Sequence, residues 1–209
     1  SDIETPDTDS DFSKFVRANN VFLYSDIMEV EIKNNEKLTP TIEGEESTVI
    51  IQNSFFAEKG NAVDYINAQN IYLNGNNIKQ TDVKKISNID ISKLSKDLAW
   101  YTKQGYNSNQ SFTDNMRYFG STISFTGNHD ADNVIIASNQ DIELKGNAKI
   151  TGILFAPKGT VTIDAGNSTT FIGIIIAQKI VIGQKATVKF KSLSEFINSG
   201  QINESELPF

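Results

Sequence analysis

The stretch ITGILFAPKGTVTI (150–163) is followed closely by FIGIIIAQKIVI (171–182), and both follow one pattern. Each contains a glycine, three apolar residues and an alanine, then a short polar break and a second apolar pair. The longest apolar run, FIGIIIA (171–177), is far shorter than the roughly 18 residues that a membrane-spanning helix needs. The two stretches therefore predict repeated units of a buried core.

The pattern extends towards the N-terminus with a nearly constant period. Ala137, Ala156 and Ala177 each end an apolar triplet and lie 19 and 21 residues apart. An alternating apolar pair follows each alanine, at Ile142/Leu144, Val161/Ile163 and Ile180/Ile182. Short strands at such a period are typical of a β-solenoid, in which like residues stack above like. Weaker copies occupy 21–32, 47–56 and 64–78. We therefore predict an all-β protein with a right-handed parallel β-solenoid over 21–190.

Three segments depart from this period. Residues 79–120 predict a helical insertion, because Ile91, Leu94, Leu98 and Tyr101 have helical spacing between Asp90 and Gly105. Residues 1–20 predict an acidic stem, with one apolar turn over the first coil from Phe12, Phe15 and Val16. Residues 191–209 predict a cap and tail, with a short helix at 192–198 that covers the edge of the last coil.

Composition narrows the classes of function. The 209 residues carry a net charge of −7, which disfavours nucleic acid as a partner. The absence of cysteine excludes disulfides, zinc–thiolate sites and cysteine catalysis. Arg17 and Arg117 are the only arginines. Because the sequence begins at Ser1 rather than Met, we expect any anchor to have preceded it.

The densest polar cluster is NHDAD (128–132), which holds the only histidine. His129, Asp130 and Asp132 are weak candidates for an oxygen-rich, Ca²⁺-like site. A solvated turn explains the same residues more simply, so we predict no metal site and no cofactor.

Carboxylates that project from strands are the other candidates for chemistry. Asp141, Glu143 and Asp164 are placed to point outward, and a carboxylate pair suffices for a glycosidase. A lyase would also need a base beside cation-binding acids, and a lysine or arginine to stabilise the developing charge. The two arginines lie outside the regular coils, and the corner lysines have no obvious acidic partner: Lys145, Lys158 and Lys179. We therefore predict no catalysis, with a polysaccharide-active lyase or glycosidase as the alternative.

Aromatic residues gather around the predicted insertion. Most of them are expected to pack the insertion against the core. Trp100, Tyr106 and Tyr118 are the candidates for a ligand or partner surface.

Three stretches of residues 122–190 carry a resemblance to a known family: NVIIASNQDIELKG, GILFAPKGTVTI and GIIIAQKIVIG. They resemble the β-solenoid ectodomains of minor pilins and pilus-assembly proteins of type IV pili, especially from Gram-positive bacteria. The preceding DISKLSKDLAWYTKQGY (90–106) is similar to a helix common in those proteins. The resemblance implies a non-catalytic, extracellular structural or adhesive module, reaching the membrane only through an N-terminal anchor helix. It implies other pilins or surface proteins as partners, with a host or glycan ligand also open. We expect a monomer in isolation.

Overall fold

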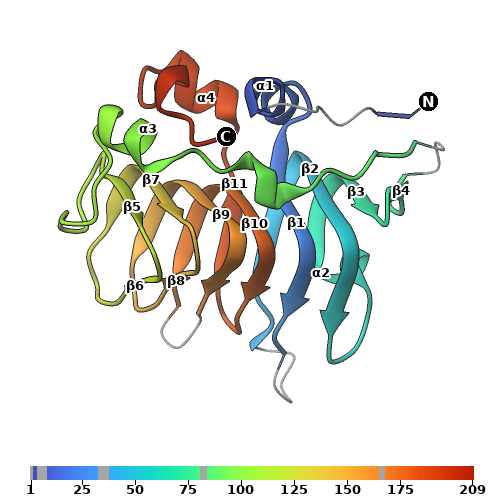
Figure 1. The fold of residues 1–209 in the computed structure, drawn as a ribbon. Coiled ribbons are helices and arrows are strands. Elements are labelled where there is room, and N and C mark those ends of the chain that lie inside the picture. Colours follow the sequence, from blue (N-terminus) through green and yellow to red (C-terminus); the bar gives the residue numbers. More distant parts are fainter. Residues whose placement is uncertain (1, 4–8, 33–37, 81–83, 165–167) are drawn as a thin grey trace.

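One large sheet dominates the computed structural model, which describes residues 2–3, 9–32, 38–80, 84–164 and 168–209 (Figure 1). The N-terminal half supplies β1 (Val21–Val30), β2 (Thr41–Ala57), β3 (Ile66–Leu73) and β4 (Asn76–Asn77). The C-terminal half supplies β5 (Arg117–Gly120), β6 (Ile123–Phe125), β7 (Ala131–Ser138), β8 (Ile142–Leu144), β9 (Lys149–Ile163), β10 (Thr170–Ile182) and β11 (Thr187–Phe190). The protein is therefore mostly β, with few helices.

The strands lie side by side in the order β5, β7, β9, β10, β1, β2, β3, β4 (Figure 1). Neighbours in this order are parallel, except for the antiparallel pair β3–β4. Outside this order, β8 pairs with β9 and β6 pairs with β8, while β11 pairs with both β10 and β2. The N-terminal strands thus extend the sheet beyond β10 instead of preceding β5.

The prediction of one right-handed β-solenoid over 21–190 is wrong, because the strands do not pair in chain order. Leu23 of β1 lies between Ile175 of β10 and Val49 of β2. Thr187 of β11 likewise pairs with β10 on one side and β2 on the other. Strands β10, β1, β2 and β11 therefore form a closed ring of four parallel strands, and β3–β4 makes the sheet mixed. An unpaired strand edge accepts any strand that offers backbone donors and acceptors, so a repeat does not fix the order.

Within the C-terminal half, the predicted like-on-like register is largely confirmed. Gly152 pairs with Gly173, and Ala156 with Ala177. Ile142 lies opposite Val161, which lies opposite Ile180. The register shifts between Ala131 and Val134, so Ala137 pairs with Phe155 rather than Ala156.

The two glycines of the repeat are required by close approach of backbone. Gly152 and Gly173 have φ of +149° and +152°. A Cβ on Gly173 would lie 1.8 Å from the carbonyl oxygen of Gly152, and one on Gly152 would lie 1.9 Å from that of Val134. No side chain fits at this distance, so the repeat needs glycine in both places.

The apolar triplets are buried on both faces of the sheet. Ile175 and Ala177 of β10 belong to an interior cluster, whereas Ile174 and Ile176 belong to a cluster on the outer face. Because successive residues of a strand point to opposite faces, a strand covered on both sides reads as a continuous apolar run. This explains GIIIA, and GILFA of β9 follows the same rule.

The outer face is covered by helices and by the C-terminal segment (Figure 1). The cover comprises α1 (Asp9–Ala18), the 3₁₀ turn η2 (Ile91–Leu94), α3 (Leu98–Lys103), α4 (Leu193–Asn198) and the 3₁₀ turn η3 (Glu204–Glu206). A further short helix, α2 (Ala62–Tyr65), precedes β3. The outer face, so defined, is the part of the molecule where segments distant in sequence meet.

The helix predicted within 79–120 is divided into two short pieces. Asp90 caps η2 by accepting a hydrogen bond from Ser92 N, and Asp97 caps α3 by accepting one from Trp100 N. Gly105, at φ +84°, follows the end of α3. The last residues of the predicted insertion 79–120 belong to the sheet, because β5 occupies 117–120. Residues 81–83 of the insertion lie outside the described residues.

The two terminal segments lie on the outer face and not at the ends of the sheet. The predicted helix at 192–198 forms, with Ser192 as its N-terminal cap. It packs beside α1 on the outer face and does not cover the edge of the last coil, because β1 and β2 pair with the strands there. Phe12, Phe15 and Val16 of α1 are buried, and the rings of Phe12 and Phe15 pack against Tyr24 of β1. Residues 4–8 of the predicted stem lie outside the described residues.

Candidate functional site

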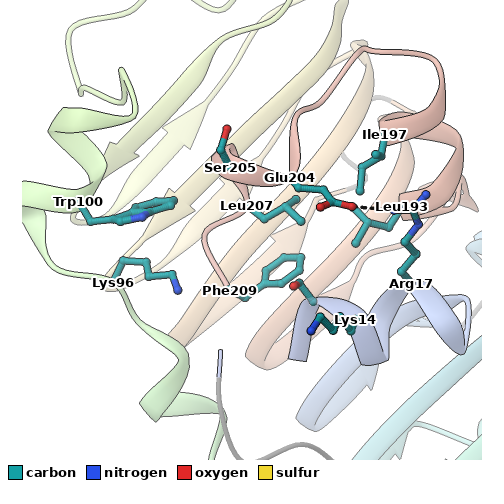
Figure 2. Close-up of a pocket in the computed structure, with 11 residues that line it drawn as sticks. Lys14, Arg17, Lys96, Trp100, Leu193, Ile197, Glu204, Ser205, Leu207 and Phe209 are labelled. Atoms are coloured by element: carbon teal, nitrogen blue, oxygen red, sulfur yellow. Dashed lines mark hydrogen bonds and ion pairs between the residues drawn. The ribbon is translucent and has the colours of Figure 1, made fainter. Parts of the chain in front are cut away.

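A cleft of about 470 Å³ opens on the outer face between α1, α4, the η2–α3 segment and residues 204–209 (Figure 2). We call it the α1–α4 cleft. Its apolar lining comprises Trp100, Leu193, Ile197, Leu207 and Phe209. Its polar lining comprises Ser13, Lys14, Arg17, Lys96, Glu204 and Ser205. The cleft thus combines an apolar floor with charged groups, as binding sites for organic ligands do.

Arg17, at the end of α1, fixes one side of the cleft. Its Nη1 donates to Glu204 Oε1 at 2.7 Å, its Nη2 to Asn198 Oδ1 at 2.8 Å, and its Nε to Ser194 Oγ at 3.1 Å. One guanidinium therefore ties α1 to both α4 and the C-terminal segment. The fork of donors on arginine makes such a three-way tie possible.

Arg117, in β5, holds the same C-terminal segment from the other end. Its Nε donates to Glu206 Oε2 at 2.6 Å, and its Nη1 to the carbonyl oxygen of Asn133 at 2.6 Å. Its Nη2 donates to the carbonyl oxygen of Gln201 at 3.2 Å. The arginine side chain is only 10 % exposed, so this ion pair is shielded from water far better than that of Arg17.

The pKa of Glu206 reflects this pairing. Partial burial by itself would raise the pKa of the carboxyl group. Hydrogen bonds from Arg117 and from the backbone of Asn203, together with the arginine charge, outweigh burial and lower the pKa below its usual value of 4.5. Glu206 therefore stays ionised and anchors the segment.

An aromatic cluster supports the Trp100 end of the cleft. The Trp100 ring centre lies 5.1 Å from that of Tyr101 and 5.9 Å from that of Tyr106. Tyr101 stacks on Phe119 of β5 with ring centres 3.8 Å apart. Lys96 Nζ lies 5.7 Å from the centre of the Trp100 ring. The aromatic packing holds α3 on the outer face and leaves Trp100 half-buried in the lining.

The three aromatic residues predicted as a contact surface do not form one. Trp100 lines the cleft, but Tyr106 is buried and donates its hydroxyl to the carbonyl oxygen of Glu206 at 2.6 Å. Burial raises the pKa of the Tyr106 phenol well above its usual value. Tyr118 points to the other face of β5, where its ring packs against Phe125 at 5.2 Å. Strand alternation separates Tyr118 from its neighbours Arg117 and Phe119.

His129, Asp130 and Asp132 lie exposed in the turn before and at the start of β7. Asp130 Oδ1 accepts a hydrogen bond from Lys149 N at 2.9 Å, and Asp132 Oδ1 accepts one from Thr151 Oγ1 at 3.3 Å. Among the residues that the structure describes, no three His, Asp or Glu side chains come together as metal ligands. These two carboxylates link adjacent strands.

The carboxylates considered for catalysis have similar partners. Asp141 Oδ1 accepts from Thr160 N at 2.8 Å, in the next turn of the sheet. Glu143 pairs with Lys145 at 2.9 Å and accepts from Ser124 at 3.3 Å. Hydrogen bonding and the charge of Glu143 raise the pKa of Lys145, and Asp164 adds to this effect. Asp164 itself follows the end of β9, close enough for its charge to act on Lys145.

The cleft residues other than Trp100 were missed by sequence reasoning. Lys14, Arg17, Lys96, Glu204 and Phe209 carry no motif, and they come from segments far apart in the chain. The only available signal was the scarcity of arginine: both arginines bind glutamates of NESELPF (203–209).

Comparison with known protein families, with curated proteins and with solved structures finds no match. The fold and the cleft therefore have to be interpreted from their own chemistry. In the part of the chain that the structure describes, no helix is long and apolar enough to cross a membrane.

Proposed function

We propose that this protein is a non-catalytic structural and adhesive module displayed outside the cell, as the head of a minor pilin-like protein on a type IV pilus or a related surface structure. The observation that carries the proposal is the position of β1. This strand follows α1 directly and lies in the middle of the sheet, between β10 and β2.

The position of β1 suits a displayed head that bears load. A pull applied at α1 along β1 acts against parallel neighbours on both edges, so many hydrogen bonds must break together. The buried Phe12, Phe15 and Val16 and the three bonds of Arg17 add resistance before β1 is reached. A module joined to a filament through its N-terminal side needs this connection.

The use of carboxylates supports a structural role. Asp130 and Asp141 each accept a backbone hydrogen bond from the following strand segment, and Glu143 of β8 accepts one from the Ser124 hydroxyl of β6. Such contacts join repeated units to each other. In the proposed display, the η2–α3 segment and the α1–α4 cleft face neighbouring pilins or a surface ligand, and the free head is a monomer.

Surface localisation is the direct test. Antibodies raised against the purified protein should label intact cells and filaments sheared from their surface. Labelling only after permeabilisation would overturn the proposal. Light scattering of the purified protein should return a mass near 23.1 kDa.

Catalysis is tested separately, with pectins, peptidoglycan and common host and plant glycans as substrates. We expect no turnover with any of them. Turnover that is lost in Asp141→Asn or Asp164→Asn would contradict the non-catalytic part of the proposal and establish a polysaccharide-active enzyme instead.

A further inference from the structure

The C-terminal ends of β1 and β2 form a second groove, at the side of the molecule away from α1 and α4 (Figure 1). Its volume is about 400 Å³. Its apolar lining comprises Val30, Ile32, Phe56 and Ala57, and its carboxylates are Glu29, Glu31 and Glu58. We call it the Phe56 groove. Its lining combines apolar surface with negative charge and contains no basic side chain.

Strand alternation places Phe56 among the carboxylates. The residues on either side of Phe56 pack towards the interior cluster, so Phe56 points away from the interior, and it is 55 % exposed. Glu29 of β1 is the register partner of Phe56 on β2, so the two side chains share a face. Glu31 and Glu58 lie two residues further along their respective chain segments and point the same way. An exposed aromatic side chain thus lies beside three acidic ones.

The carboxylates of the groove are only partly neutralised by the protein itself. Glu29 Oε2 lies 3.2 Å from Lys179 Nζ of β10. Among the residues that the structure describes, neither Glu31 nor Glu58 forms an ion pair or a side-chain hydrogen bond. The charges of these two carboxylates are therefore available to a cation that enters the groove.

The aromatic side chain narrows the choice of cation. A guanidinium group is planar and weakly hydrated, so it stacks on an aromatic ring while its N–H groups donate to carboxylates. A metal ion would gain nothing from Phe56. In the described part of the chain, moreover, no three His, Asp or Glu side chains come together as metal ligands. The groove therefore suits an arginine side chain, whose aliphatic stem also covers apolar surface.

A second copy of this chain is a poor source of that arginine. Arg17 and Arg117 are its only arginines, and both are engaged with glutamates of the C-terminal segment. The net charge of −7 also makes two copies repel each other. The occupant has to come from a different protein.

From these observations we propose that the Phe56 groove binds an arginine-containing segment of a partner protein. The guanidinium stacks on Phe56 and pairs with Glu31 and Glu58, and its stem rests on the apolar lining. The inference relies on the proposed function only in that the module makes protein contacts. It adds a contact at the opposite end of β1 from α1, with a partner of defined chemistry.

Nuclear magnetic resonance titration of the isotope-labelled full chain tests the proposal. The probe is the peptide acetyl-Gly-Arg-Val-Arg-Gly-amide. We expect saturable shifts of the backbone amides of residues 29–31 and 56–58. Citrulline in place of both arginines should abolish the shifts, because it keeps the shape without the charge. Lysine in place of both should weaken binding by about threefold, because an ammonium group stacks poorly.

Charge-removal variants locate the binding. Glu31→Gln combined with Glu58→Gln should weaken binding of the peptide by about tenfold or more. The matched control combines Glu45→Gln with Glu46→Gln, which changes the net charge equally at two exposed glutamates outside the groove lining. The control should bind within about twofold of the wild type.

A second pair of variants tests the ring. Phe56→Ala should weaken binding by about fivefold, because the guanidinium loses its stacking surface. Leu98→Ala is the matched control, since Leu98 is 67 % exposed on α3 and lies outside the groove lining. It should leave the affinity unchanged. Both side chains are exposed, so both variants should fold.

Several results would overturn the proposal. They are an equal loss of affinity in the two double variants, an unchanged affinity in Phe56→Ala, and the absence of shifts at residues 29–31 and 56–58 at millimolar peptide. Saturable binding of Ca²⁺ that displaces the peptide and does not depend on Phe56 would show a metal site instead. Each of these would leave the surface-labelling result untouched, and failure of surface labelling would leave the titration unchanged.

Discussion

The interior of the sheet and its helix-covered outer face are both apolar, yet they are built differently. The interior stacks equivalent residues of successive repeats, such as Ile142, Val161 and Ile180. On the outer face, the ring centre of Phe209 lies 5.8 Å from that of Phe12 and 5.5 Å from that of Phe155. These three rings come from the C-terminal segment, α1 and β9. A repeated sequence can specify the first kind of core with local information, whereas the second depends on contacts between the two ends of the chain.

This contrast predicts how each region responds to damage. A defect in the interior interrupts a ladder that every neighbouring strand uses, so the whole domain should unfold. A defect on the outer face should loosen only the segments that meet there, because the strands beneath keep their hydrogen bonds.

The largest effect is expected from a charge placed in the interior. Ile142 is fully buried, whereas its neighbour Glu143 points outward. Ile142→Asp should destabilise the protein by more than about 4 kcal/mol, because an unpaired carboxylate is buried in the ladder. Glu143→Gln, the matched control one residue along the strand, should change stability by under about 0.5 kcal/mol. Urea unfolding followed by circular dichroism measures both, and a folded Ile142→Asp variant would contradict the interior assignment.

A second interior defect tests the close stacking of the repeat. Gly173→Ala should cost about 3 kcal/mol or more, because its Cβ would lie 1.8 Å from the backbone oxygen of Gly152. Gly105→Ala has a positive φ of +84° but open space around the added carbon, so it should cost only about 1 kcal/mol. Similar losses for the two variants would mean that backbone conformation, not stacking distance, limits the repeat.

The two arginines form a shielded and an exposed ion pair on the outer face, and replacing each one compares their contributions to stability. Arg117→Gln should cost about 3 kcal/mol, because Glu206 and several carbonyl oxygens lose a largely buried donor. Arg17→Gln should cost less than about 1 kcal/mol, since Glu204 is 67 % exposed. Hydrogen exchange should show the loss at residues 201–206 in both variants. A global loss of protection in Arg117→Gln would instead make the outer face part of the same cooperative unit as the interior.

The smallest effect is a pH dependence carried by Glu206. Its pKa is lowered in the folded protein, so its contribution to stability is complete above the usual value of 4.5 and disappears as pH falls through the lower folded value. The stability difference between wild type and Glu206→Gln should therefore be constant near neutral pH and shrink in acid. Unfolding at a series of pH values measures it. A difference that grows in acid would show that the pKa is raised rather than lowered.

Several particular elements were predictable from the sequence. The register of Gly152 with Gly173 and of Ala156 with Ala177 follows from two copies of one pattern. The helix that begins after Ser192 follows from local capping chemistry. The placement of β1 between β10 and β2 was not predictable, because both edges of a parallel strand offer the same backbone groups.

The candidate site was largely hidden. Trp100 was singled out for its residue type, but Lys14, Lys96 and Phe209 have no local feature that marks them. Tyr106 and Tyr118 look equivalent in the sequence, yet Tyr106 lies under η3 and Tyr118 inside the sheet. Tyr106 follows α3 and is held by the carbonyl oxygen of Glu206, whereas alternation along β5 turns Tyr118 towards the interior cluster.

By itself, the sequence determined that the protein is mostly β, that its apolar triplets are buried and that matching glycines stack. These properties depend on side-chain alternation and on the space around one backbone position, both of which are local. The tertiary structure alone decided that the N-terminal strands close a ring with β10 and β11 and that both arginines bind the C-terminal segment. It also decided that α1 and α4 leave a cleft between them. These features join residues as far as 187 positions apart in the chain. Such contacts form after the local units, between strand edges and charged side chains that the local units leave unpaired.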